Sequence, residues 1–406
     1  QCVAIYEDAR ARIRGLAQEA SQRPKITTAA EVMAPLAPFD SVRVTSEAER
    51  AISSDARREF FGRLPEEERP RHMSMLLNRA LGDLLLKYPE ALIFGEDVAR
   101  KGGVYHVTAD LQKRAGVGRV FNTPLDETAI LGLAMGAAQQ GMLPIPEIQY
   151  LAYLHNAIDQ IRGEASSLSF FSQGQFQNPM VIRIAGLAYQ KGFGGHFHND
   201  NSIAALRDIP GLWISCPSNG LDAVGMLRTC VAAARLHGQV SVFLEPIALY
   251  MTKDLYEDKD GLWSFAYPGP DHSVALGRAR THTEGSHLTI LSYGNGLWMS
   301  LRVAQRLESK GISTRVVDLR WLNPLPVDDI VEAAKATGTV LIVDECRQTG
   351  GMAEPILTAL VEHCPEVSMK RVAAMDSFIP LGAAANLVLV QEEAIEAAAL
   401  ALVEST

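Results

Sequence analysis

The sequence predicts an α/β protein in which parallel sheets carry helices on both faces. The first observation is that strand, loop and helix patterns recur in that order from His72 onward, as in parallel strands joined by crossover helices. The second is that this recurrence starts again after a stretch of different composition between Tyr256 and Asp271, which indicates a second, smaller α/β domain. A chain of 406 residues can bury two or three domain cores.

The N-terminal residues 1–70 predict a helix followed by a linker. Tyr6 to Ala20 follow a polar helical pattern without the apolar centre of a signal peptide. Residues 21–70 are rich in Pro, Ala, Ser, Glu and Arg, so we expect a linker with short helical pieces. Because the sequence starts at Gln1 without an initiator Met, processing, fusion to an upstream segment, a tag and a disordered start all stay open.

The first α/β domain is expected over residues 71–256. Short apolar runs predict its strands, and longer runs with helical spacing predict its helices. In chain order we expect a helix at 72–86, a strand at 91–95, a helix at 126–141, a strand at 145–149, a helix at 154–170, strands at 180–185 and 212–216, a helix at 220–236 and a strand at 240–244.

The second α/β domain is expected over residues 272–402, after the change in composition. It repeats the same alternation of apolar runs and helical patterns. In chain order we expect a strand at 288–292, a helix at 297–310, a strand at 313–318, a helix at 327–336, a strand at 340–344 and a helix at 351–363.

Composition and charge exclude several classes of protein. Lys and Arg number 38 against 47 Asp and Glu, a net charge of −9, which argues against nucleic acid as a partner. The longest apolar stretch, Ala129 to Ala138, is far shorter than the roughly 20 residues that span a bilayer, so no membrane helix is expected. The five cysteines form no C-x-x-C pair, which argues against a disulfide framework or a zinc knuckle and favours a reducing cytoplasm.

Common nucleotide-binding and hydrolase motifs are missing from the sequence. It contains no G-x-x-x-x-G-K-[ST], no G-x-S-x-G and no H-E-x-x-H. The run from Gly192 to His198 fails the dinucleotide-binding spacing, because Phe197 stands where the third Gly of G-x-G-x-x-G is required. Phosphate loops for nucleotides and zinc hydrolase sites are therefore not expected.

The start of the helix at 126–141 contains two carboxylates with different explanations. Thr123 is the expected N-cap, with Pro124 at the first helical position and Asp126 three residues after the cap, so a capping box accounts for Asp126. Glu127 comes directly before the run 129–138, which is apolar on all faces and must be buried. A favourable interaction with the helix dipole and a functional role both stay open for Glu127.

Two further features have a structural and a functional interpretation. Gly132 and Gly136 lie one turn apart and suit either core packing or close packing at a subunit interface. The loop 186–202 is rich in glycine and carries His196 and His198, and loops of this length inside compact domains are often functional. No cysteine or carboxylate cluster with ligand spacing accompanies these histidines, so a surface or catalytic role is favoured over metal binding.

A series of short strings resembles the beta subunit of the decarboxylating component of thiamine-dependent 2-oxo acid dehydrogenases. Their order and spacing match over about residues 72–395, which is more specific than any single string. The strings are Phe94-Gly-Glu-Asp-Val98, Thr123-Pro-Leu-Asp-Glu127, Glu147-Ile-Gln149, Ala157-Ile-Asp-Gln-Ile161, His198, Ile209-Pro-Gly-Leu212, Pro217-Ser218, Phe243-Leu-Glu-Pro246, Val317-Asp-Leu-Arg-Trp-Leu-Asn-Pro-Leu325, Asp344-Glu345 and Gly350-Gly351.

The resemblance implies a pyrimidine-binding thiamine diphosphate fold followed by a transketolase C-terminal-like α/β domain. It assigns Glu127 to the ring nitrogen of the cofactor's aminopyrimidine, where the carboxyl group promotes the imino tautomer that generates the thiazolium ylide. An apolar setting would raise the pKa of this carboxyl group. The resemblance also places Tyr153 as the aromatic residue that stacks on the aminopyrimidine, with Leu125 and Gln149 as flanking contacts.

His198 matches the family's histidine for proton transfer and for acyl transfer to a lipoyl group. The family has a Ser-Gln-Ser run after this histidine, whereas this chain has the run 199–201, Asn-Asp-Asn, which leaves the acceptor of His198 open. Some family members also hold potassium near a cysteine that is followed by an acidic residue. Cys230 is present, but residues 231–235 include no acid, so no metal site is predicted in this chain.

The resemblance also implies partners. In the family, a G-D-G motif binds the diphosphate of thiamine diphosphate through Mg²⁺, and this sequence contains no G-D-G. We therefore expect an alpha subunit, or an alpha half fused upstream, to hold Mg²⁺ and the diphosphate. The expected assembly is of the alpha2beta2 type and delivers acyl groups to a lipoyl acyltransferase core. The segment 6–38 would suit the junction of a fused chain.

The expected activity is decarboxylation of a 2-oxo acid, of pyruvate or branched-chain type, with transfer of the acyl group to lipoamide. The resemblance weakly favours branched-chain substrates because of Tyr153, Leu125 and Gln149. The sequence does not identify the acid. A two-chain transketolase that transfers a ketol unit, and a non-catalytic structural subunit, are the alternatives.

Overall fold

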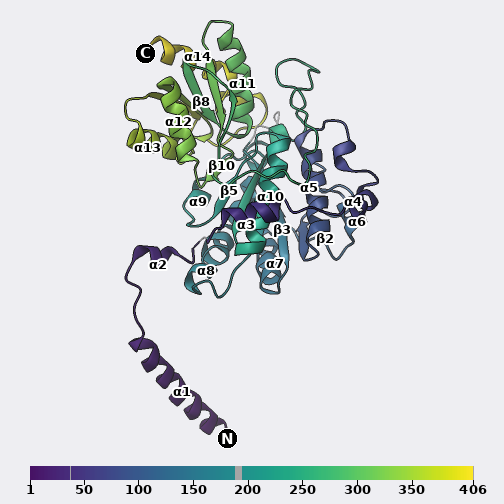
Figure 1. The fold of residues 1–406 in the computed structure, drawn as a ribbon, viewed down its shortest axis with the longest axis vertical. Coiled ribbons are helices and arrows are strands. Elements are labelled where there is room, and N and C mark those ends of the chain that lie inside the picture. The colour runs from purple at the N-terminus through teal and green to yellow at the C-terminus, as the bar shows by residue number, and fades with distance from the viewer. Residues whose placement is uncertain (37, 188–193, 406) are drawn as a thin grey trace. The chain divides into compact units, whose positions relative to one another are not determined.

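The computed structural model describes residues 1–36, 38–187 and 194–405, and the chain divides into two compact units at Pro35 and Leu36 (Figure 1). The first unit contains the helices α1 (Cys2–Gln22) and α2 (Ala29–Met33). The side chain of Thr28 accepts a hydrogen bond from the backbone of Glu31 while Glu31 reaches back, so a capping box starts α2. The helix predicted at 6–20 is present, as α1.

The second unit contains a seven-stranded sheet in the order β10-β5-β6-β4-β3-β1-β2. Its strands pair in parallel, except that β10 lies antiparallel to β5. The strands are β1 (Ala91–Gly95), β2 (Val120–Asn122), β3 (Leu143–Ile148), β4 (Met180–Gly186), β5 (Trp213–Ser215), β6 (Val240–Pro246) and β10 (Trp321–Asn323).

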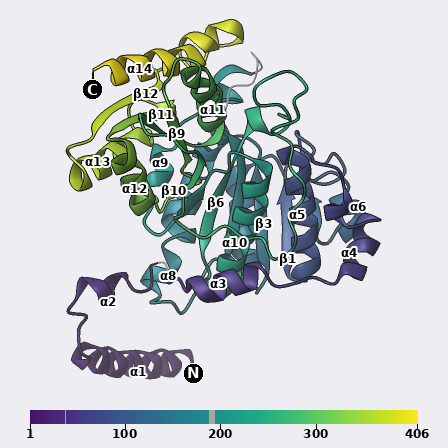
Figure 2. The ribbon, with the colours of Figure 1, turned by 45° about the horizontal axis from the view of Figure 1, so that its top comes forward.

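Helices cover both faces of this sheet, because its strands are apolar on both sides. On β4, Val181 packs into the core with α5 (Met73–Lys87) and α10 (Gly220–His237). Its neighbours Ile182 and Ile184 face the opposite way and pack with α7 (Glu127–Gln139). Figure 2 shows α5 and α10 in front of the strands. This arrangement confirms the predicted parallel sheet with helices on both faces.

A second sheet of five strands has the order β12-β11-β8-β9-β7, with β7 antiparallel to β9. Residues of α12 and α13 share one hydrophobic core with α7, whereas α11 and α14 pack on a separate core. The elements are β7 (Arg280–Thr283), β8 (Leu288–Ser292), α11 (Gly294–Glu308), β9 (Thr314–Asp318), α12 (Val327–Thr337), β11 (Thr339–Arg347), α13 (Ala353–His363), β12 (Ser368–Ala374) and α14 (Glu392–Glu404).

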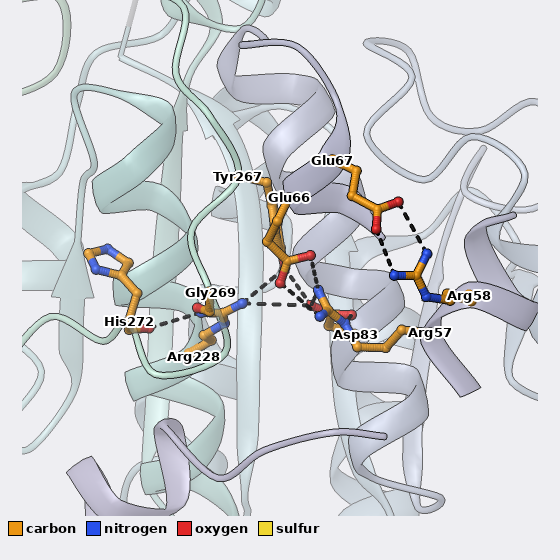
Figure 3. Close-up of polar contacts among 9 residues, drawn as sticks. All are labelled: Arg57, Arg58, Glu66, Glu67, Asp83, Arg228, Tyr267, Gly269 and His272. Carbon is orange, nitrogen blue, oxygen red and sulfur yellow. Dashed lines mark hydrogen bonds and ion pairs between the residues drawn. The ribbon is translucent and has the colours of Figure 1, made fainter. Parts of the chain in front are cut away.

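Part of the predicted linker packs on the body of the protein. The helix α3 (Ser41–Ala48) buries Val44 and Ala48, and α4 (Ser54–Phe61) buries Arg57. Arg57 donates to both oxygens of Asp83 on α5, at 2.7 and 3.0 Å, and Tyr267 and Arg228 reach the same carboxylate (Figure 3). Asp83 therefore connects α10 and the segment after β6 with the N-terminal arm, which is the segment 36–70 that contains α3 and α4.

Short elements complete the described chain. They are η1 (Pro65–Glu67), α6 (Leu111–Ala115), η2 (Leu151–Asn156), η3 (Gln160–Ala165), α8 (Leu168–Phe171), η4 (Gly195–Phe197), α9 (Ala204–Arg207), η5 (Ile247–Leu249) and η6 (Gly382–Leu387). None of the helices that the structure describes combines the length and hydropathy needed to span a bilayer.

The helix predicted at 154–170 is wrong, because this segment forms η2, the π-helix η3 and α8 in succession. One cause is visible in a side-chain contact. The Thr128 hydroxyl donates to the carbonyl of Asn156 at 2.7 Å and so occupies an acceptor that a continuous helix would use. The domain limits near residues 70 and 256–272 stay predictions.

Candidate functional site

The candidate site lies where neighbouring parallel strands end at one edge of the first sheet. Glu96 follows β1, Gln149 follows β3, and the loop that carries His198 follows β4. In open α/β sheets, ligands bind outside the carboxyl ends of the strands. The connections after adjacent strands therefore bring chemically useful side chains to this edge.

Glu127 is the first residue of α7 and is only 4% exposed. The predicted cap is wrong: the helix starts later than expected, so Asp126 is the N-cap, and its side chain accepts a hydrogen bond from the backbone of Thr128 at 3.1 Å. Thr123 makes no such bond, and its buried hydroxyl has no partner among the described atoms. Because Asp126 caps the helix, the Glu127 carboxylate is left for other contacts.

A second carboxyl group, Glu96, lies within hydrogen-bonding reach of Glu127. Burial, followed by the charge of Glu127, raises the pKa of Glu96 to about 7. A neighbouring negative charge disfavours ionisation of a buried carboxyl group, so Glu96 keeps its proton up to about pH 7. The Asn156 side-chain amide donates a hydrogen bond to Oε2 of Glu127 at 3.2 Å. The sequence interpretation gave no role to Glu96 or Asn156, although an acidic pair directly after an apolar strand was the available signal.

Tyr153 and His198 meet although they belong to different connections. The Tyr153 hydroxyl lies 3.5 Å from Nε2 of His198, and the ring of Tyr150 packs edge-on against the His198 ring, with centroids 4.8 Å apart. Burial raises the pKa of Tyr153, and the charges of Glu96 and Glu127 add to this shift. The predicted aromatic residue, acid and histidine therefore belong to one local cluster.

The backbone before His198 accommodates only glycine at position 194. Gly194 has φ +69°, and a Cβ atom at this position would lie 2.1 Å from Nδ1 of His198. Close by, buried Asp200 contacts Arg347 at 2.9 Å and Ser202 at 2.6 Å. These contacts fix the second half of the predicted glycine-rich loop. Residues 188–193, which include Gly192, lie outside the described residues.

Gln149 and Leu125 occupy different environments. The Gln149 amide donates to Asp97 at 3.0 Å, and Asp97 also pairs with Lys101 at 2.6 Å. Gln149 therefore lies beside Asp97, the second residue of the Glu96-Asp97 sequence that follows β1. Leu125 is 78% exposed and contributes no part of this chain's core.

A buried ion-pair network supports the strand ends beneath the site. Arg183 on β4 contacts Glu147 on β3 at 2.7 Å and Glu245 on β6 at 2.6 Å. The Tyr250 hydroxyl donates to the same Glu245 carboxylate at 2.5 Å. Because these groups are almost fully buried, paired and hydrogen-bonded, they hold three strands in a fixed arrangement.

The run 129–138 on α7 is not buried on all faces, contrary to expectation. Leu133 is 43% exposed, and Ala129, Gly132 and Gly136 are exposed as well. A Cβ atom added at Gly132 or Gly136 would meet no atom of the described residues within 4 Å, so packing against the described core is not the reason for either glycine. The helix that begins with Glu127 therefore presents an open apolar face.

A separate cluster resembles a metal site in composition. Asp222, His282 and Asp318 place potential ligand atoms within 4.8 Å of one another. However, Arg280 and Arg320 each lie 3.2 Å from the Asp222 carboxylate. Two guanidinium groups make this position unfavourable for a further cation. We interpret the cluster as an ion-pair junction between α10 and the second sheet.

Comparisons with known proteins agree with this geometry. A model of the transketolase pyrimidine-binding domain matches residues 69–253, and one of the transketolase C-terminal domain matches residues 277–395. The pyruvate dehydrogenase E1 component subunit beta of Staphylococcus epidermidis is 33% identical over 340 residues, which cover 82% of this chain and 98% of that protein. The 2-oxoisovalerate dehydrogenase subunit beta of Bacillus subtilis is 34% identical over 304 residues, or 74% of this chain and 88% of that protein.

A solved structure shows the same fold. It is titled as a split-gene transketolase, an inactive beta4 tetramer, and it covers 82% of this chain and 99% of its own length. The TM-score is 0.62 and the sequence identity is 22%. The predicted fold, a pyrimidine-binding α/β module followed by a transketolase C-terminal-like domain, is thereby confirmed.

Proposed function

The chain belongs to the family of beta subunits of the E1 component of 2-oxo acid dehydrogenases, and from this premise we propose that it forms the pyrimidine-binding half of a thiamine diphosphate site. The proposed reaction is decarboxylation of a 2-oxo acid, of pyruvate or branched-chain type, followed by acyl transfer to a lipoyl group. The observation that carries this proposal is the buried Glu127 at the start of α7 with Glu96, whose pKa is raised, close by, and with Tyr153 in contact with His198.

The residues present fit an aminopyrimidine. Its ring nitrogen needs a carboxyl group that keeps a proton near neutral pH, and the raised pKa of Glu96 keeps a proton in the carboxyl pair. Oε1 of Glu96 is buried without a hydrogen-bond partner among the described atoms, so it can accept from a ligand. Thiamine diphosphate, when bound, supplies a carbon nucleophile that attacks the ketone of a 2-oxo acid.

The chain's own residues have distinct roles in this proposal. The Glu127 carboxyl group hydrogen-bonds the pyrimidine nitrogen, and Glu96, whose raised pKa keeps it protonated near neutral pH, supplies a proton next to it. Tyr153 offers its ring for stacking. His198 is positioned by the Tyr153 hydroxyl and by the backbone at Gly194, and it transfers a proton during acyl transfer. Leu125 and Gln149 flank the pyrimidine.

The open faces of this chain support a second polypeptide at the site. Leu125 and the exposed side of α7 lie next to Glu127 along the chain, and both are apolar. An alpha subunit or alpha half that binds Mg²⁺ and the diphosphate would cover them and exclude water from the carboxyl pair. The assembly we propose is of the alpha2beta2 type, associated with a lipoyl acyltransferase core.

The test uses the chain assembled with its alpha partner, thiamine diphosphate and Mg²⁺. Wild-type protein is expected to turn over 2-oxo acids with a lipoylated acceptor and to leave sugar phosphates unchanged. Glu127→Gln is expected to lower the turnover rate at least about 100-fold, because it removes general acid–base help at the pyrimidine. The matched control, Glu362→Gln, changes an exposed glutamate on α13 and should retain wild-type turnover.

Two outcomes would contradict the proposal. Full activity of the assembled Glu127→Gln variant would show that this carboxyl group takes no part in the chemistry and would favour a structural subunit. Ketol transfer between sugar phosphates by the wild-type assembly would instead favour a two-chain transketolase. Circular dichroism of each variant checks that the fold is retained.

A further inference from the structure

The loop after β4 is attached to the second sheet by its buried run 199–201. Each side chain of this run is at most 2% exposed. The carboxylate of Asp200 accepts from Nη2 of Arg347 on β11 at 2.9 Å. The Asn201 amide donates to the backbone carbonyl of Glu345, on the same strand, at 2.7 Å. Two side-chain contacts therefore fix the run to one strand of the second sheet.

The strand β11 is irregular where it makes these contacts. Its register with β12 shifts between Asp344 and Arg347, as at a β-bulge. Bulges redirect side chains out of the regular alternation of a strand and are common next to functional sites. Nε of Arg347 also donates to the carbonyl of Ser377 at 3.1 Å. Arg347 is therefore held by its own sheet in an orientation that faces the loop.

Asp200 connects this attachment to His198. The turn between them is tight, because the backbone of His198 and the side chain of Asn199 both donate to the carbonyl of Gly195, at 3.2 and 3.0 Å. The backbone carbonyl of Asp200 accepts from Leu187, the residue after β4, at 3.3 Å. Because His198 is only two residues from this fixed point, a shift of Asp200 is expected to move the imidazole ring.

Arg347 is the counter-charge that the geometry assigns to Asp200. Two histidines also approach this carboxylate, with Nε2 of His155 at 3.7 Å and Nδ1 of His196 at 3.9 Å. Both distances are beyond a hydrogen bond. An arginine stays charged at every pH at which proteins are folded, whereas a histidine does not. Because a buried carboxylate requires a charged partner, Arg347 supplies it.

We propose that the ion pair of Asp200 and Arg347 positions His198 for acyl transfer to the lipoyl group. Both are positioning residues that act through the histidine. This inference rests on the proposed function, which assigns a proton transfer to His198. The first sheet then provides the histidine, and the second sheet fixes its place. Loss of the ion pair lowers the rate of acyl transfer and leaves decarboxylation intact.

The test substitutes Arg347 in the full chain, assembled with its alpha partner, thiamine diphosphate and Mg²⁺. Arg347→Met removes the charge, whereas Arg347→Lys keeps a cation on a flexible stem. Acyl transfer to lipoamide is expected to fall at least about tenfold in Arg347→Met and to stay within about threefold of wild type in Arg347→Lys. Decarboxylation with ferricyanide as the electron acceptor, in place of the lipoyl group, should be unchanged in both.

The matched control is Glu354→Gln. Glu354 on α13 pairs with Arg207 on α9 at 3.5 Å, so this substitution also removes a charge from an ion pair that joins two distant segments. Its rate of acyl transfer should stay within about twofold of wild type. Wild-type acyl transfer in Arg347→Met, equal losses in Arg347→Met and Arg347→Lys, or a parallel loss of decarboxylation would each overturn the inference.

Hydrogen exchange of residues 194–203 in the chain alone gives a readout that needs no activity. Exchange in this segment should be faster in Arg347→Met than in wild type and Glu354→Gln, with the rest of the chain unchanged. Unchanged exchange in Arg347→Met would overturn the attachment itself. A wild-type assembly that does not decarboxylate 2-oxo acids would instead contradict the proposed function, and the exchange experiment would still decide whether Arg347 holds the loop.

Discussion

The hydroxyl of Tyr153 lies 3.5 Å from Nε2 of His198, although the two residues follow different strands and are 45 positions apart. This contact joins the side chain proposed to stack on the cofactor with the side chain proposed to move a proton. A change at either residue is therefore expected to affect both binding and acyl transfer, and the two effects can be separated by the choice of substitution.

At Tyr153, the ring and the hydroxyl are expected to have separable roles. Tyr153→Phe keeps the stacking surface, so the Kd of thiamine diphosphate in the assembled complex should stay within about threefold of wild type. Tyr153→Ala removes the surface and should weaken binding at least about tenfold, since stacking of an aromatic ring on a base contributes roughly 1–3 kcal/mol. Fluorescence titration of the cofactor checks both values. Equal affinity for the Ala variant would rule out stacking.

At Gly194, an added methyl group is expected to displace His198. Its Cβ atom would lie 2.1 Å from Nδ1 of the histidine, so Gly194→Ala should lower the rate of acyl transfer to lipoamide at least about tenfold. Gly174→Ala is the matched control, because Gly174 also has a positive φ but has no atom of the described chain within 4 Å of the added methyl group. Both variants should lose roughly 1–2 kcal/mol of stability because Ala is strained at a positive φ. Gly194→Ala should lose more than Gly174→Ala because of the collision with His198, and only Gly194→Ala should lose acyl transfer. A rate loss of equal size in both would trace the effect to backbone strain.

At Glu96, the raised pKa predicts a dependence of stability on pH. The folded protein keeps a proton on this carboxyl group up to about pH 7, whereas the unfolded chain loses it near the ordinary value of 4.5. The folded state therefore binds more protons between these values, and its free energy of unfolding falls as the pH rises from 4.5 to 7. Glu96→Gln should make Tm less dependent on pH over this range in thermal unfolding of the chain alone. A pH profile identical to that of wild type would contradict the raised pKa of Glu96.

At Asp83, loss of one charge is expected to cost more stability than loss of an exposed pair. Asp83→Asn leaves Arg228 and part of Arg57 without a buried counter-charge, so the free energy of unfolding should fall by about 3 kcal/mol. Glu67→Gln removes the exposed ion pair with Arg58, which Figure 3 shows nearby, and should cost less than about 1 kcal/mol. Urea unfolding of both variants checks the difference. Equal losses would show that the buried network does not hold the arm in place.

The sequence predicted the sheets well because their strands are apolar and their helices follow regular spacing. It failed where side chains compete with the backbone, as when the Thr128 hydroxyl binds the carbonyl of Asn156 and breaks the expected helix at 154–170. It also omitted β2, β7, β10 and β12. The first three have only three or four residues, and β12 is polar on its exposed side. Such strands depend on pairing with distant neighbours, which a local pattern does not contain.

For the site, resemblance supplied Glu127, Tyr153 and His198, and the structure brings them to one edge of the sheet. It could not supply the carboxyl pair, because the proximity of Glu96 to Glu127 arises from β1 and α7 meeting in space. The cap of α7 was also placed too early, at Thr123 in place of Asp126. The roles of Leu125 and Gln149 stay predictions, since none of the described residues covers the exposed Leu125 side chain.

The open side of α7 bears on how a cell must produce this protein. On α7, Leu133 is 43% exposed, and Gly132 and Gly136 have no side chain. This face is therefore an exposed apolar surface to which other chains can bind. Copies that are synthesised in excess of the alpha polypeptide would aggregate through this apolar surface. If the two polypeptides are synthesised in equal amounts, or as one continuous chain, the apolar surface of α7 is covered as soon as the chain folds.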